Sequence, residues 1–144
     1  MKTKFNFIRI LTFIICLSLY SCDPMYDVKI LNKSDHDVIV KIQLDKKTLP
    51  PSWDGRYLIV YFEAKAAVER GTLISTDTVN CISIFKLKPN EFFTVESSMG
   101  TKPNFSIIKS IHIFDRDTII LNSKEKMFEL FKEKKERNFE FEIK

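Results

Sequence analysis

The chain has 144 residues and a formal net charge of +4, and 44% of its residues are hydrophobic. This length predicts one domain. Residues 1–21 hold three basic residues and no acidic one, which leaves 20 basic and 19 acidic residues in the remainder. Because the remainder is close to neutral, long-range attraction to nucleic acid is excluded as its function, and we expect no nucleic-acid partner.

The first 22 residues have the pattern of an export signal. A basic start precedes an apolar stretch from Ile10 to Leu19, which is too short for the roughly 20 residues that a membrane span needs. The stretch ends in Leu19-Tyr20-Ser21-Cys22, and this tetrapeptide resembles the lipobox of bacterial lipoproteins. The resemblance implies that 1–21 is a signal peptide that is removed, and that lipidation occurs at Cys22. An ordinary secretory signal with a cysteine nearby is the alternative.

The lipoprotein resemblance implies a cell-envelope protein, and we expect it at the outer membrane, on either the periplasmic or the surface face. Residues 22–25 would form a tether that reaches roughly 13 Å when extended, and residues 26–144 the single folded domain. We therefore expect two partners, the membrane lipid through acylated Cys22 and a membrane-proximal protein. Removal of Cys16 with the signal and acylation of Cys22 leave Cys81 as the one free thiol, so no intramolecular disulfide is expected.

The mature chain is predicted to consist mainly of β-strands. Apolar and polar residues alternate in 26–30 and in 38–44, and the turn-forming residues between these segments predict a β-hairpin. A loop with two prolines and a glycine follows, and the apolar run 57–62 predicts a central strand covered on both faces. Residues 63–70 fit either a short helix or a turn. Further strands are expected at 78–86, 91–97 and 107–114.

The C-terminal part predicts a helix followed by a strand. Asn122 is placed to cap a helix over 123–137, in which Glu133 and Arg137 are spaced for an i,i+4 contact. Alternation in 139–143 predicts the last strand. About seven strands, with one C-terminal helix before the last, predict an immunoglobulin-like antiparallel β-sandwich.

Three short stretches carry a second resemblance. Cys22-Asp23-Pro24, Leu49-Pro50-Pro51-Ser52-Trp53 and the segment Ile113-Phe114-Asp115-Arg116-Asp117-Thr118 resemble parts of small Bacteroidota-type lipoproteins of unknown function. That family has no assigned catalytic residues. The resemblance therefore implies the same location in the cell envelope and indicates no activity.

The loop around Trp53 holds the candidate contact residues Trp53, Arg56 and Tyr57. An indole, a guanidinium and a phenol beside two prolines could form a platform for a glycan or a peptide, because Trp, Tyr and Arg are enriched at interaction hot spots. The alternative is that Trp53, the only tryptophan, folds back to close one end of the sandwich.

Catalytic and metal sites have weaker support in the sequence. Asp115-Arg116-Asp117-Thr118 is similar to the nucleophile strand of haloacid-dehalogenase-like phosphatases, but the threonine comes one residue too early. The two aspartates are expected to end a strand, with a Ca²⁺ site as the alternative. A thiol nucleophile would need Cys81 beside His112 and a carboxylate such as Asp37, and a zinc site would need Cys81 with His112 or His36.

The leading hypothesis is a non-catalytic, membrane-anchored lipoprotein that acts as an accessory or protein-interaction module, without a cofactor or a metal. The alternative is a lipoprotein that binds a glycan or a peptide through the Trp53 loop. The third hypothesis is a hydrolase that uses Cys81 or Asp115, and it requires a base within hydrogen-bond reach of one of these side chains.

Overall fold

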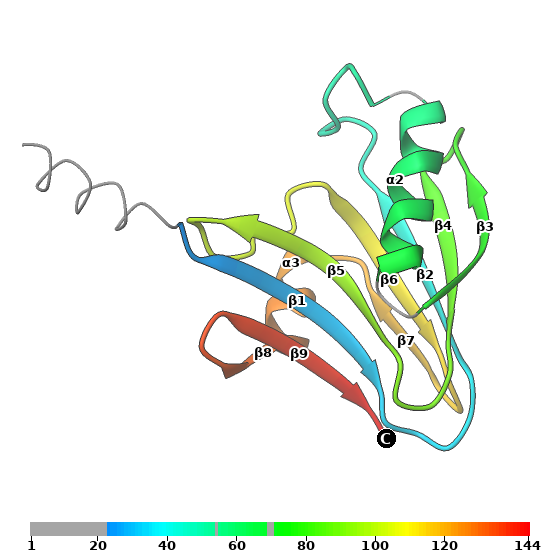
Figure 1. Ribbon diagram of the computed structural model, residues 1–144, viewed down its shortest axis with the longest axis vertical. Helices are drawn as coiled ribbons and strands as arrows, with labels where there is room; N and C mark the ends of the chain where they lie inside the picture. The colour runs from blue at the N-terminus through cyan, green and yellow to red at the C-terminus, as the bar shows by residue number, and fades with distance from the viewer. Residues whose placement is uncertain (1–22, 54, 69–70) are drawn as a thin grey trace, which may run out of the picture.

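The computed structural model describes residues 23–53, 55–68 and 71–144, so the predicted signal peptide and Cys22 lie outside the described residues. In the described part, nine strands form two sheets, and two helices accompany them (Figure 1). The four-stranded sheet contains, in spatial order, β5 (Phe92–Met99), β1 (Met25–Asn32), β9 (Asn138–Ile143) and β8 (Lys132–Lys135). The five-stranded sheet contains β3 (Thr72–Asp77), β4 (Ile82–Leu87), β2 (Val38–Leu44), β6 (Ile108–Phe114) and β7 (Thr118–Leu121).

The predicted mainly β sandwich is confirmed, with nine strands rather than about seven. One strand pair departs from the expected antiparallel arrangement, because β1 runs parallel to β9. Alternating side chains of both sheets build the core. Val28 and Ile30 of β1 are fully buried, as are Val38 and Val40 of β2. This period-two burial is why the sequence pattern identifies the strands.

The predicted hairpin between residues 26–30 and 38–44 is wrong. β1 pairs with β5 and β9, whereas β2 pairs with β4 and β6 in the other sheet. The turn between them is a crossover held by the buried side chain of Asn32. Its Nδ2 donates to the carbonyls of His36 and Leu87 at 2.7 and 2.9 Å, and its Oδ1 accepts from the Ser34 amide at 3.0 Å. A short polar turn indicates that the chain changes direction, but it does not indicate that the two strands on either side of it pair with each other.

The predicted central strand at 57–62 is also wrong, because these residues lie in helix α2 (Gly55–Val68). Leu58 and Phe62, four residues apart, are buried against the core, while Ile59 and Val60 are 38% and 57% exposed. One face of a helix explains this burial, since residues four apart lie above one another. The open choice for 63–70 is resolved as helix up to Val68, and residues 69–70 lie outside the described residues.

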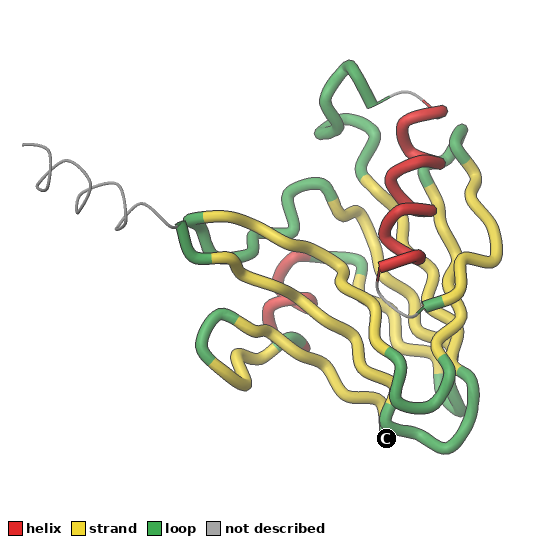
Figure 2. Tube along the Cα trace, viewed as in Figure 1, coloured by secondary structure: helices red, strands yellow, loops and turns green. Residues whose placement is uncertain are grey.

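Helix α2 covers the space where the two sheets separate (Figure 2). Phe62 contacts Phe85 of the five-stranded sheet at 5.8 Å between ring centroids, and Phe85 contacts Phe93 of the four-stranded sheet at 4.1 Å. Lys65 donates to the β5 carbonyls of Thr94 and, at 3.3 Å, Val95. The helix is thereby attached to β5, the edge strand of the four-stranded sheet. Covering an edge strand with a helix is a common way of preventing it from pairing with another chain.

One further strand boundary differs from the prediction, and two strands were not predicted. The segment 78–86 begins with a turn at residues 78–81, and β4 starts only at Ile82. The Asp77 carboxylate holds this turn by accepting from the amides of Val79 and Asn80 at 3.0 and 3.1 Å. The strand before the turn, β3, was not predicted, and neither was the four-residue β7.

The predicted helix over 123–137 is shorter than expected. Helix α3 (Lys124–Leu130) has Ser123, not Asn122, as its N-cap, and the Ser123 side chain accepts from the Lys126 amide at 3.4 Å. β8 follows directly. Glu133 and Arg137 therefore make no helical i,i+4 contact; instead the Glu133 carboxylate accepts from the Arg137 amide at 3.1 Å. No helix in the described part of the chain is long and apolar enough to cross a membrane.

Candidate functional site

A cleft of about 330 Å³ opens between the loop after β2, helix α2 and the β3–β4 turn. Leu49, Pro50 and Pro51 line it from the loop, Leu58 from the helix, and Thr78 and Cys81 from the turn. Trp53 forms a further part of the wall, and among the described residues of the lining Lys46 contributes the one charged side chain. Most of the lining residues are apolar in type, but polar atoms make up the larger part of the wall that faces the cleft, and the Lys46 amine can orient a ligand.

Trp53 is partly buried and packs against the core from the side of the cleft. Its amide donates to the Pro50 carbonyl at 2.9 Å, which closes a tight turn in the loop. The indole contacts the rings of Tyr57 and Tyr61 on α2, with centroid separations of 4.8 and 5.1 Å. Residues 57 and 61 are one helical turn apart, so their rings stack at 6.4 Å and present one aromatic surface.

The three predicted contact residues occupy different places. Trp53 both covers part of the core and lines the cleft. Tyr57 is 44% exposed and contacts Trp53, although it is not part of the lining itself. Arg56 is exposed in the first turn of α2. The structure thus brings Trp53 and Tyr57 together and leaves the Arg56 guanidinium at the surface.

The suggested thiol site is not assembled. Cys81 is 3% exposed, and its Sγ lies 3.8 Å from the Thr78 carbonyl. Cys81 belongs to the buried core, whereas His112 of β6 lies on the outer side of the five-stranded sheet, opposite Lys41. Burial, and secondarily the Lys41 charge, lower the pKa of His112. Asp37 instead pairs with Lys86 at 3.4 Å.

The Asp115-Arg116-Asp117 segment forms the turn between β6 and β7, as expected for aspartates that end a strand. The Asp115 amide donates to the Asp117 carbonyl at 3.3 Å. Asp115 also binds Nε2 of His36, whose Nδ1 binds Asp35 at 2.8 Å. Hydrogen bonds to the two carboxylates, Asp35 first, raise the pKa of His36.

This cluster of Asp35, His36 and Asp115 had no signal in the sequence. His36 and Asp115 are 79 positions apart, and only the placement of the β1–β2 crossover beside the β6–β7 turn brings them together. Within residues 23–53, 55–68 and 71–144, no group of three or more His, Cys, Asp or Glu side chains is arranged to hold a metal ion. The cluster therefore joins two turns of the fold.

The cleft offers the indole of Trp53, aliphatic side chains and the Lys46 amine, which suits the binding of a group that combines an apolar part with a hydrogen-bond acceptor. The thiol in its wall makes its hydrogen bond to a backbone carbonyl. In comparisons with known proteins, no family model, no curated protein and no solved structure matches this chain. Function is accordingly inferred from the geometry of the chain itself.

Proposed function

We propose that this chain is a non-catalytic lipoprotein of the cell envelope, anchored through Cys22, that acts as an interaction module for a membrane-proximal protein. The start of β1 supports this function most directly. β1 begins at Met25, three residues after Cys22, and is hydrogen-bonded on both sides, to β5 and to β9. Three extended residues span roughly 11 Å, so a lipid on Cys22 would hold the folded domain close to the membrane surface.

The Trp53 cleft is the contact site that we assign to this module. A volume of about 330 Å³ lies at the lower end of the range for small-ligand sites and accommodates one or two side chains of a bound segment. Trp and Tyr side chains dominate the energetics of many interfaces because they bury a large area with few rotatable bonds. The partner segment would insert an apolar or aromatic side chain against Trp53, with an acceptor near Lys46.

A glycan is the second candidate ligand for the same cleft. The rings of Tyr57 and Tyr61, which contact Trp53 beside the cleft, favour it, because the flat apolar face of a sugar ring packs well on aromatic side chains. A fluorescence titration distinguishes a glycan ligand from a peptide ligand. Titration with oligosaccharides or with apolar peptides should shift the fluorescence of Trp53, and the class that shifts it at lower concentration identifies the ligand class.

The absence of catalysis is part of the proposal and is supported by two positions. Cys81 is enclosed in the core wall of the cleft, and its sulfur contacts a backbone carbonyl. Asp115, the other suggested nucleophile, is engaged by His36 in a contact that links two turns. To act as a nucleophile, Cys81 would have to break its contact with the Thr78 carbonyl, and Asp115 its contact with His36.

Co-purification from native membranes tests the proposal. The tagged native chain is compared with Trp53→Ala and with a control, Phe114→Ala. The control removes a 40% exposed aromatic ring at the C-terminal end of β6, and Phe114 does not line the cleft. We expect one stoichiometric partner that is retained by Phe114→Ala, lost in Trp53→Ala and lost when Cys22→Ala blocks acylation. If Trp53→Ala and Phe114→Ala capture equal amounts of the partner, the cleft is excluded as the contact site. If no partner is captured in any sample, the proposal of an interaction module is contradicted.

A further inference from the structure

Two methionines form an exposed apolar pair where β1 begins. Met25 of β1 and Met99 of β5 are register partners, so their side chains project from the same face of the sheet. Met25 is 55% exposed and Met99 is 73% exposed. The flexible, polarisable thioether side chain of methionine is well suited to adaptable apolar contacts.

The backbone around this pair is held in place. The Gly100 amide donates to the Pro24 carbonyl at 2.8 Å, and the Ser97 hydroxyl donates to the Asp27 carboxylate at 2.8 Å. Gly100 adopts a φ of +71°, a conformation that glycine tolerates, and a Cβ there would lie 3.8 Å from the Asp23 side chain. Residues 23–25 are thus docked on the end of β5, and the methionine pair is held in place at the start of the described chain.

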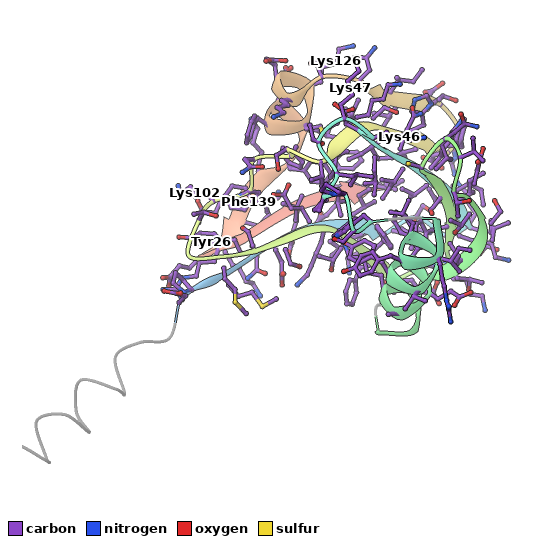
Figure 3. All side chains as sticks on the ribbon, turned by 90° about the horizontal axis from the view of Figure 1, so that it is seen from above. Tyr26, Lys46, Lys47, Lys102, Lys126 and Phe139 are labelled. Carbon is purple, nitrogen blue, oxygen red and sulfur yellow. The ribbon has the colours of Figure 1, made fainter. Side chains whose placement is uncertain are left out.

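The charges near this pair are mixed. Asp23 is exposed, and Lys102 is 71% exposed and lies 3.9 Å from Glu133. Figure 3 places Lys102 at the same end of the domain as Tyr26, apart from Lys46 at the rim of the Trp53 cleft. A balanced set of charges gives little attraction to anionic headgroups, so the apolar side chains would dominate any contact with a bilayer.

We propose that Met25 and Met99 insert into the boundary between headgroups and acyl chains beside the lipid on Cys22, and so fix the orientation of the domain on the membrane. This inference rests on the proposed acylation of Cys22. Met25 lies within roughly 11 Å of that residue along the chain, and apolar side chains of membrane-surface proteins typically enter about 5–10 Å into this boundary. The loop after β2 and helix α2, whose residues line the Trp53 cleft, lie away from the start of β1 (Figure 1).

Methionine oxidation provides the test. The mature acylated protein carrying Val79→Met is reconstituted in phosphatidylcholine vesicles and treated with hydrogen peroxide. Each thioether sulfur is oxidised to the sulfoxide while the peroxide is reduced to water. Val79 is 73% exposed, as Met99 is, and it lies in the β3–β4 turn, so the introduced methionine is a matched control. Met127 is fully buried and serves as the protected reference.

We expect Met25 and Met99 to oxidise roughly tenfold or more slowly than the methionine introduced at position 79, because the lipid boundary excludes water and peroxide. Equal rates at the three positions in vesicle-bound protein would overturn the membrane contact and leave the anchor intact. Protection that disappears when the protein is diluted in the membrane would assign the surface to a second copy, and would also overturn it. A protein that fails to float with the vesicles would instead contradict the proposed anchoring.

Discussion

His36 Nε2 binds the Asp115 carboxylate and thereby joins the β1–β2 crossover to the β6–β7 turn. The side chain of His36 is 37% exposed and that of Asp115 is 15% exposed. Asp35 binds the other ring nitrogen at 2.8 Å, and Arg116 lies 3.8 Å from Asp35. The imidazole thus lies between two carboxylates, with one guanidinium nearby, and its protonated form is the one that both carboxylates favour.

The first prediction concerns the pH dependence of stability. The pKa of His36 is raised in the folded chain by its hydrogen bonds to Asp35 and Asp115. A raised folded pKa contributes stability that is fully present below the unfolded value of about 6.5 and is lost as the pH rises through the folded pKa. The urea midpoint of the native chain should therefore fall between pH 5.5 and pH 8.5, and His36→Gln should reduce this fall.

The matched control for this prediction is His112→Gln. Burial lowers the pKa of His112, so its contribution to stability has the opposite sign: it destabilises the folded chain at low pH, and this penalty is relieved as the pH rises from the folded pKa through the unfolded value. Its removal should leave the fall in urea midpoint intact or enlarge it. A fall of the same size in the native chain and in His36→Gln would show that the His36–Asp115 contact does not act on stability.

The second prediction concerns the core contact between the two sheets. Phe85 is fully buried, and its ring lies between Phe62 of α2 and Phe93 of β5. Phe85→Ala should lower the free energy of unfolding by about 3–5 kcal/mol, as expected when a large aromatic side chain is removed from a packed core. Equilibrium denaturation in urea measures this loss. Phe128→Ala, which removes a 48% exposed ring, should cost clearly less, and equal losses would refute the assigned core.

The third prediction concerns the crossover. Asn32→Ala removes a buried amide that donates to two carbonyls and accepts from Ser34. The loss should be about 2–4 kcal/mol, because the buried carbonyl of Leu87 and the Ser34 amide lose their partner. Asn122→Ala, which changes an exposed asparagine, is the control and should leave the urea midpoint nearly unchanged. A comparable midpoint in the two variants would mean that Asn32 does not hold the crossover.

The sequence predicted strands where burial alternates, as in β1 and β2, because period two is a direct consequence of strand geometry. It could not predict the partner of β1, since the short polar turn at 33–37 fits a hairpin and a crossover equally. The apolar run 57–62 predicts a central strand because aromatic and β-branched residues occupy both of its alternating faces, which would bury Ile59 and Val60. In the structure both are exposed on a helix, so the surface of α2 is more apolar than a typical solvent-facing helix.

The candidate site was predictable only in part. Trp53 was selected for its residue type, and it does line the cleft. Tyr61 and Cys81 belong to the same region because α2 is a helix and because β3 and β4 are joined by a tight turn, and neither element was expected. The contact between His36 and Asp115 depends on the strand order of the five-stranded sheet, which no local pattern specifies.

The mass of the N-terminal peptide from protein extracted from native membranes tests the central claim most directly. Every functional proposal depends on a mature chain that starts at Cys22 and carries a lipid there. We predict a peptide that begins at Cys22 with a diacylglycerol on its sulfur, and complete loss of this species in Cys22→Ala. An unmodified Cys22, or an N-terminus at any other residue, would contradict the anchored interaction module.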